Sequence, residues 1–442
     1  MNHSQQLNVS RRKFLRWSGA GAAIVATGGL GGLLSACAPS SPAPTTAFTT
    51  ATSAAANVVT LSTATIRPSG APVDVELALK AAPGKAAIFN GKETSVWSYR
   101  GEVLSGDPNS LVHIPDSYLG PIIRVKRGQK IRINYSNEIP QPSIVHWHGL
   151  HVPDVVDGHP RFAVDPGQGY TYEFEIANRA GMYWYHPHPH GQTGPQVYAG
   201  MAGLFMISDD EEEALGLPTG DYDIPLVLQD RVIDGNNQLV YMPNGMMDQM
   251  IGFLGNRLLV NGKPDYELSV ENRAYRLRFL NGSNSRIYKL GWQDGTPLTV
   301  IATDGGLLEK PVQRNYVTLA PAERVELWVD FSQWELGSEL TLQSLAFSGA
   351  SPMGGGMGGG ASVPNGAPFN VLNVRVEREA REKPALPAQL STIPRYQLSE
   401  AVNANNPRTF TLGMQQMTWT LNGRTFEMTN VANDEIVKLN TL

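Results

Sequence analysis

Histidine is the residue type in this sequence whose spacing points most directly to chemistry. The chain has nine histidines, and the stretches VHWHG and HPHPHG between them carry His146, His148, His186, His188 and His190. Residues i and i+2 of a strand point to the same face, so each stretch places its imidazoles side by side. One such pair is commonly just two half-buried polar side chains. Two pairs, each followed by glycine, favour a shared site for Cu, Zn, Ni or Fe.

Prolines alternate with the histidines of the second stretch. Pro187 and Pro189 have no N–H to donate, so this stretch is expected to be an edge strand or an extended loop. Proline also restricts φ. We therefore expect the imidazoles to be held in an extended array before any metal binds.

Composition excludes several other classes of function. The formal net charge is −5 and no basic stripe is present, so a nucleic-acid partner is not expected. The single cysteine, Cys37, cannot form an internal disulfide. The sequence contains no phosphate-binding loop, Ser/His/Asp set or paired-carboxylate site. Its 45 glycines and 31 prolines suit a turn-rich β protein.

Period-2 alternation of apolar and polar residues recurs along the chain, in KIRINY (130–135), YTYEFEI (170–176), YRLRF (275–279) and VELWVDF (325–331). Ile131, Ile133 and Tyr135 are expected on a buried face, with charged and polar neighbours facing water. Half-buried strands between Gly, Pro and Asn turns predict antiparallel β-sandwiches.

Weak self-similarity suggests three related sandwich units. Residues 258–281 resemble residues 418–440, and residues 120–137 share the same pattern. We predict units at 57–210, 215–380 and 395–442, connected by an acidic run at 208–215 and by residues 378–390. A sandwich of this kind needs ~100 residues, so the third is expected to be incomplete.

The N-terminus, residues 1–37, resembles a twin-arginine export signal, with Arg11 and Arg12 before a glycine-rich uncharged stretch. It ends in LSAC, which resembles a bacterial lipobox with Cys37 as the acylated residue; cleavage near Ala56 is the alternative. Residues 38–56 are expected to be a flexible tether. The implied partner is the twin-arginine export machinery. The implied location is the periplasm or cell envelope, with a lipoprotein anchor.

The stretches HWHGLHVPDVVDG and GMYWYHPHPHGQTGPQVYAGMAGLF resemble the first two copper-binding motifs of the multicopper oxidases. This family includes laccases and bacterial cuprous oxidases and is built of three cupredoxin domains. The resemblance implies an all-β fold of tandem cupredoxin-like Greek-key β-sandwiches, with the third truncated. By position it implies that His146 is a type 2 copper ligand and that His148, His186 and His188 are type 3 ligands.

Other residues near these motifs receive weaker assignments. His190 is not expected to be a ligand, but to support the ligands from outside or to have a structural role. His151 and His159 are expected at the surface. Asp157 aligns with the family's acidic residue beside the copper cluster, which implies a proton relay to reduced oxygen. A plain Asp-Gly turn explains Asp157 equally well, and both interpretations stay open.

The resemblance implies that phenols, aromatic amines or metal ions such as Cu(I) are oxidised one electron at a time, while O2 is reduced to water. A blue-copper site needs a thiolate and two histidines, but the only cysteine is Cys37 and no histidine follows His190. We therefore expect this 442-residue chain to be a fragment of an oxidase and inactive alone. The alternatives are a shortened or copper-poor relative, a non-catalytic envelope scaffold, or a protein that stores copper.

A glycine-rich stretch at 349–368 carries Met353 and Met357, and residues 242–250 add four methionines. Thioethers favour Cu(I), as in the methionine-rich loops of cuprous oxidases. A flexible surface loop and an ordinary apolar segment are the alternatives.

Overall fold

The computed structural model describes residues 58–61, 68–245, 248–249, 252–348, 363–415, 418–438 and 441–442. The predicted export signal and tether, including Cys37, lie outside the described residues, as do Met353 and Met357. No helix within the described ranges is long and apolar enough to cross a membrane.

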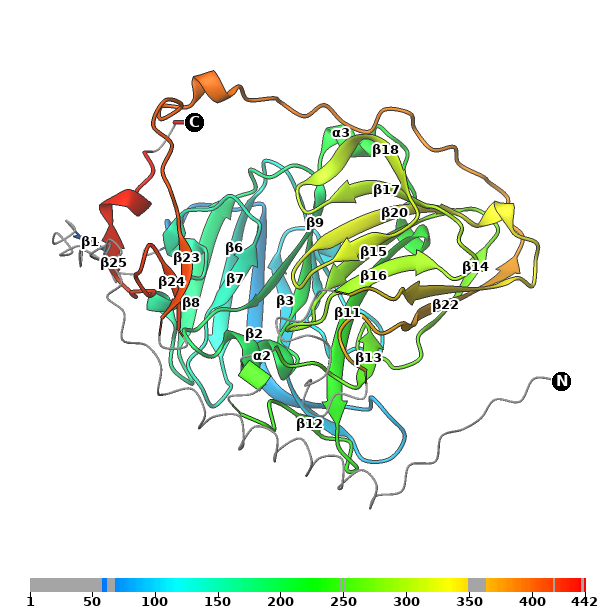
Figure 1. Cartoon of the computed structure of the whole chain (residues 1–442), viewed down its shortest axis with the longest axis horizontal. Coiled ribbons are helices and arrows are strands. Elements are labelled where there is room, and N and C mark those ends of the chain that lie inside the picture. The colour runs from blue at the N-terminus through cyan, green and yellow to red at the C-terminus, as the bar shows by residue number, and fades with distance from the viewer. Residues whose placement is uncertain are drawn as a thin grey trace, which may run out of the picture. The chain divides into compact units, whose positions relative to one another are not determined.

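Strands outnumber helices throughout the described residues, and the helices are short, which confirms the predicted all-β class. The first sandwich pairs a four-stranded sheet, in the order β3-β2-β6-β8, with a five-stranded sheet, β4-β5-β10-β9-β7 (Figure 1). The strands are β2 (Val75–Ala86), β3 (Thr94–Ser105), β4 (Leu111–Val112), β5 (Ile122–Lys126), β6 (Lys130–Asn137), β7 (Val145–His148), β8 (Gly169–Glu175), β9 (Gly181–Pro187) and β10 (Gly203–Ser208). Short helices η1 (Pro108–Ser110), η2 (Asp154–Val156), η3 (Pro160–Phe162), α2 (Thr193–Tyr198) and α3 (Asp210–Glu213) connect or follow them.

The core of the first sandwich follows the predicted alternation. Ile131, Ile133 and Tyr135 of β6 are buried, as predicted. Trp147, from the middle of β7, is fully buried and its ring contacts the rings of Tyr172 at 5.0 Å and of other core aromatics. Burial of each large apolar side chain contributes about 1.5–3 kcal/mol, which fixes the register of these strands.

The second sandwich pairs a larger sheet, β12-β11-β15-β20-β17-β18 with β13 on β11, with a five-stranded sheet, β14-β22-β21-β16-β19 (Figure 1). The strands are β11 (Asp223–Ile233), β12 (Leu239–Val240), β13 (Arg257–Val260), β14 (Glu267–Glu271), β15 (Ala274–Asn281), β16 (Tyr288–Trp292), β17 (Leu298–Thr303), β18 (Gly306–Arg314), β19 (Val317–Leu319), β20 (Arg324–Asp330), β21 (Glu339–Ser344) and β22 (Phe369–Arg378). The helices η4 (Gly220–Tyr222) and η5 (Phe331–Gln333) flank β11 and β20.

The prediction that β15 and β20 expose their charged face is wrong. Arg276, Arg278 and Glu326 are all buried. The Arg278 guanidinium donates to both carboxylate oxygens of Asp223, at 2.6 and 2.7 Å, and Arg276 Nε donates to Glu326 at 2.6 Å. Glu212 of the acidic connection also pairs with Arg276, at 2.6 Å. Because every charge has a partner, this face can be covered without leaving an uncompensated ion.

The two sandwiches share one apolar cluster. Met182 and Trp184 of β9 pack in this cluster with Val227, Leu259 and Leu280 from the second sandwich. The backbones also approach closely, since a Cβ on Gly306 would lie 2.3 Å from the Ala180 carbonyl oxygen.

The C-terminal residues form small elements: η6 (Leu398–Glu400), a hairpin of β23 (Leu412–Gln415) and β24 (Thr418–Leu421), and β25 (Asn430–Ala432) followed by η7 (Asn433–Glu435). Strand β25 pairs with β1 (Val58–Thr60), so these first described residues pair outside the first sandwich. The predicted similarity is visible at two Asn-Gly turns, where Asn261 and Asn422 have φ values of 52° and 50°. Such turns favour residues with positive φ.

The buried ion network yields a stability prediction. Glu326→Gln leaves the two guanidinium groups of Arg276 and Arg278 short of one carboxylate in the protein interior. We expect the free energy of unfolding to fall by about 3–5 kcal/mol, measured by urea denaturation. Glu339→Gln is the matched control, because Glu339 pairs with Arg375 at the surface. A Glu326→Gln variant as stable as the control would contradict the prediction.

Candidate metal centre

Antiparallel pairing of β7 with β9 brings the two histidine motifs together. His146 lies directly opposite His186 in the register, and His148 lies opposite Trp184. The chain after β9 stays beside β7, because the His188 N–H donates to the Ile144 carbonyl oxygen at 2.9 Å. The imidazole centroids of the four histidines lie 5.2–5.9 Å apart in five of their pairings. The prediction that the two pairs meet at one place is confirmed.

The second histidine stretch was expected to be an edge strand or an extended loop, and the structure divides it: Pro187 ends β9, which is not an edge strand, and Pro189 lies after the strand. β9 lies between β10 and β7, and the edge strand of the sheet is β7. Pairing with β10 ends at Tyr185, so Pro187 lies beyond the last residue of β9 that pairs with β10. There its missing N–H costs no ladder hydrogen bond. Pro189 and His190 have already left the strand.

Two ring nitrogens from opposite strands nearly touch. His148 Nδ1 lies 3.3 Å from His186 Nε2. The other ring nitrogen of His186, Nδ1, lies 2.9 Å from the Pro187 carbonyl oxygen and can only donate to it. Donation from Nδ1 leaves Nε2 without a proton in the neutral ring, so a lone pair points toward His148.

His146 is oriented by the turn that follows β7. Its Nδ1 lies 2.6 Å from the backbone carbonyl oxygen of Asp157 and 3.3 Å from the Asp157 carboxylate. Gly158 makes this contact possible, because its φ is +80° and a Cβ there would lie 2.1 Å from the Val145 carbonyl oxygen. The Asp-Gly turn therefore fixes the tautomer that leaves His146 Nε2 without a proton.

The electrostatics keep most of these imidazoles neutral. Burial, with added repulsion from Arg324 and neighbouring histidines, lowers the pKa of His148 to about 4. Burial also lowers the pKa values of His186 and His188. His146 is the exception: burial opposes its protonation, but the hydrogen bonds to Asp157 outweigh burial and raise its pKa.

These residues fit a metal ion. His146, His148 and His186 each offer one nitrogen within 4.8 Å of the others. Two nitrogens 3.3 Å apart can each lie about 2.0–2.1 Å from one ion at a roughly tetrahedral angle. His188 adds a buried Nδ1 that has no hydrogen-bond partner among the described residues. The donors are all imidazole, which suits Cu, Zn, Ni or Fe rather than Mg or Ca.

A cavity of about 360 Å³ lies against His146 and His188. Asp157 lines it and is half-buried. His159 was expected at the surface, but it is half-buried, lines the same cavity and accepts a hydrogen bond from the Arg161 N–H through Nδ1. His151 is exposed, as expected. His190 is exposed, lines the cavity, and its ring centroid lies 5.2 Å from that of Phe426.

Sequence reasoning missed two residues beside the centre. The Trp184 ring packs in a tilted arrangement against the rings of His186 and His148, at centroid distances of 4.3 and 5.1 Å. The period-2 rule could have identified it, since Trp184 precedes His186 by two residues. Arg324 comes from β20 of the second sandwich, and no local pattern connects it to the histidines.

Comparison with known proteins gives a consistent result. A family model described as multicopper oxidase matches residues 96–212. A multicopper oxidase from Staphylococcus aureus is 34% identical over 255 residues, which cover 58% of this chain and 53% of the relative. Cell division protein FtsP from Edwardsiella tarda is 36% identical over 250 residues, which cover 56% and 51%. The chain thus spans about half the length of the curated relatives it matches.

Two solved structures match a larger share of this chain than the curated relatives do. The McoA multicopper oxidase from Aquifex aeolicus superposes with a TM-score of 0.67 and 34% identity, covering 80% of this chain and 72% of McoA. A laccase from Pediococcus acidilactici has a TM-score of 0.64 and 30% identity, covering 83% and 73%.

The turn at Gly158 yields a prediction on metal affinity. Gly158→Ala forces a Cβ against the backbone of Val145, so the Asp157 carbonyl must move away from His146. We expect Cu²⁺ affinity to fall about 10- to 100-fold, measured by isothermal titration. Gly167→Ala is the control, because Gly167 has a φ of +82° but no atom within 4 Å of the added carbon. An equal loss of Cu²⁺ affinity in both variants would contradict the prediction, because it would show that alanine at a positive φ is sufficient to weaken binding.

The depressed pKa of His148 yields a prediction on pH. Between about pH 4 and 6.5 the unfolded chain binds a proton at His148 that the folded chain does not. Metal-free protein should therefore lose stability as pH falls through this window. The measurement is the free energy of unfolding in urea, with a chelator present, at pH 7 and at pH 4.5. The difference between these two values should be smaller for His148→Gln than for the wild type. His146 titrates in both proteins, so its opposite effect cancels; equal pH dependence would contradict the prediction.

Proposed function

Because this chain belongs to the multicopper oxidase family, we propose that its four clustered histidines bind copper as part of an oxygen-reducing centre. The proposed reaction couples one-electron oxidation of a small reducing substrate to the four-electron reduction of O2 to water. Phenols, aromatic amines and metal ions such as Cu(I) are the proposed substrate classes.

One observation carries the proposal: two strands deliver imidazoles to a single point, with His148 Nδ1 3.3 Å from His186 Nε2. By family resemblance, His146 would hold type 2 copper, and His148, His186 and His188 would hold type 3 copper. Bound copper would supply the electron transfer to oxygen. A site that only needed to fold would have no reason to bury several imidazoles in their neutral form.

The protein's own groups have proposed roles around that centre. Trp147 and Trp184, both buried, exclude water from the strand side of the histidines. The cavity beside His146 and His188 gives a small molecule access from the other side. The carboxylate of Asp157 lines this cavity, so we assign it the proposed proton relay, while its backbone carbonyl holds His146. In this proposal, Asp157 combines the two roles that the sequence left open.

The remaining assignments extend the proposal to the cell. We propose export through the twin-arginine machinery to the periplasm or envelope, with Cys37 as a lipid-anchored residue. The divisions at 57–210, 215–380 and 395–442 remain the proposed domain boundaries.

A second candidate function is a non-catalytic copper-binding or envelope scaffold protein. One observation favours it: the similarity to proteins named cell division protein FtsP. Copper binding separates the alternatives, because a scaffold has no requirement for a tight site.

Copper stoichiometry is the first test. We expect the purified 442-residue chain to bind Cu²⁺ tightly and His186→Gln to bind fewer ions, measured by titration and elemental analysis. His151→Gln, which changes an exposed histidine, is the control. The absence of tight copper in the wild-type chain would favour the scaffold. We also expect no intense blue thiolate–copper absorbance and no oxidase turnover from this chain alone, and the appearance of either would contradict that expectation.

A further inference from the structure

The segment from Met182 to Tyr198 carries the complete second histidine motif, and it is bonded to the second sandwich at both ends. Its middle holds His186 and His188, and its ends hold main-chain carbonyl groups that accept hydrogen bonds from the second sandwich. The sandwich that contributes no ligand therefore contacts the ligand-bearing segment on both sides of the ligands.

The upstream bond comes from Arg324 at the start of β20. Its Nε donates to the Met182 carbonyl oxygen of β9 at 3.1 Å. Its other nitrogens donate to the carbonyl oxygens of Ala322 and Asp304, at 3.0 and 2.9 Å, and pair with the Asp304 carboxylate at 3.0 Å. The Arg324 side chain is 4% exposed. A buried guanidinium with this many acceptors has one orientation, and it fixes the strand that it contacts.

Arg324 also lies beside the turn that follows His148. A Cβ on Gly149 would be 3.2 Å from Arg324 Nη2 and 3.1 Å from the Tyr183 ring. The guanidinium carbon lies 5.8 Å from the centre of that ring. The same side chain is therefore adjacent to the strand of His186 and to the residue after His148, the two histidines whose nitrogens nearly touch.

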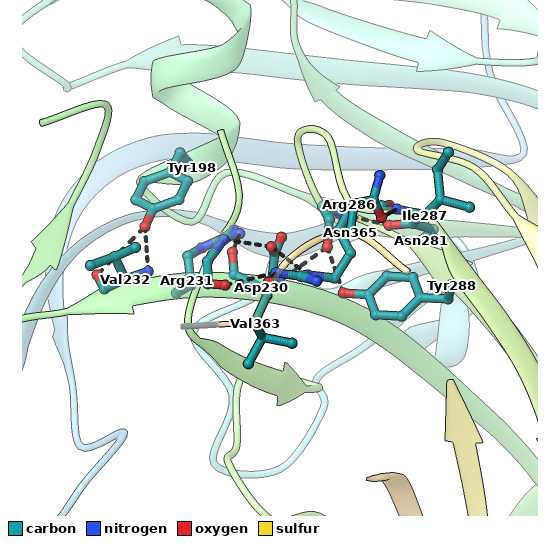
Figure 2. A network of polar contacts seen from close by, with 12 residues as sticks. Tyr198, Asp230, Arg231, Val232, Asn281, Arg286, Ile287, Tyr288, Val363 and Asn365 are labelled. Carbon is teal, nitrogen blue, oxygen red and sulfur yellow. Dashed lines mark hydrogen bonds and ion pairs between the residues drawn. The ribbon is translucent and has the colours of Figure 1, made fainter. Parts of the chain in front are cut away.

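The downstream bonds reach helix α2. Arg231 Nη2 donates to the Val197 carbonyl oxygen at 3.2 Å, and Asn284 Nδ2 donates to the Gly194 carbonyl oxygen at 2.9 Å. The Val232 N–H donates to the Tyr198 hydroxyl at 2.7 Å, and Figure 2 shows this pair next to Arg231. The Arg231 guanidinium also lies over the Tyr198 ring, at 4.7 Å.

We propose that Arg324 and Arg231 are positioning residues for the copper ligands, so that the second sandwich is a working part of the metal centre. This inference rests on the proposed copper site. Arg324 sets the distance between the strands of His148 and His186, and Arg231 sets where the chain returns after His188. Both act through main-chain carbonyls, not by contact with the metal.

The size of the expected effect follows from the tolerance of metal sites. Ligands must be held within ~0.5 Å of their working positions, and outer partners of metal ligands typically change affinity about 10- to 100-fold when removed. Lysine retains the charge of arginine but lacks the planar fork that reaches several acceptors. A positioning role therefore predicts that lysine does not replace Arg324.

The test compares full-length wild type with Arg324→Met, Arg324→Lys and Arg231→Met. Each protein is freed of metal with a chelator and titrated with Cu²⁺, and the bound ion is examined by electron paramagnetic resonance. We expect all three variants to bind Cu²⁺ about 10- to 100-fold more weakly and to show an altered pattern of nitrogen hyperfine coupling. Arg314→Met, at an exposed position of the same sandwich, should match the wild type.

A second control separates positioning from loss of stability. Leu342→Ala removes a fully buried core side chain of the second sandwich, so it should lower thermal stability while leaving the copper spectrum unchanged. Equal spectral change in Leu342→Ala, or wild-type binding by Arg324→Lys, would overturn the positioning role. If the wild type binds copper and the arginine variants bind it identically, only this inference fails. If the wild type binds no copper, the proposed function fails with it.

Discussion

The candidate metal centre depends on one structural constraint, the antiparallel register of β7 and β9. Because the side-chain period of a strand is two, this register places His146 and His148 on the same face as Trp184 and His186. A slip of one residue would turn the histidines into the core and Trp147 out of it. Trp147 is fully buried against the aromatic side chains of the first sandwich, so the slip is strongly disfavoured. The apolar core thus sets the geometry of the polar site.

The second sandwich extends this constraint beyond a single domain. The Trp184 ring packs against two candidate ligands, His148 and His186. Trp184 also belongs to the apolar cluster that contains Val227 and Leu280 of the second sandwich. The glycine contact between Gly306 and the Ala180 carbonyl leaves no space for adjustment at the start of β9. The strand that carries His186 is therefore confined by its own sheet, by the shared apolar cluster and by the arginine bonds.

The parts that sequence predicted are those governed by local periodicity. Alternation identified β6 and β8 and placed each histidine pair on one face. It failed where long-range pairing overrides it: Arg276 and Glu326 alternate with apolar residues like exposed charges, yet they form a buried ion network. The position of Arg324 beside the centre and the pairing of β1 with β25 depend on contacts between residues more than a hundred positions apart. The position of His159 at the cavity depends on the path of a loop. No local pattern encodes those contacts.

The burial of the histidines also has a thermodynamic consequence for how the site works. His186 is almost completely buried, and its pKa is lowered mainly by that burial. His148 Nδ1 and His186 Nε2 lie 3.3 Å apart, so two bare lone pairs would repel each other there unless a proton or a metal ion lies between them. A metal ion bound there would satisfy both nitrogens at once and would stabilise the folded state that presents them. Three features hold the histidine side chains in place before a metal binds: the register of the two strands, the Asp-Gly turn and the contacts from the second sandwich. Each of them would reduce the conformational entropy that the protein loses when it binds a metal ion.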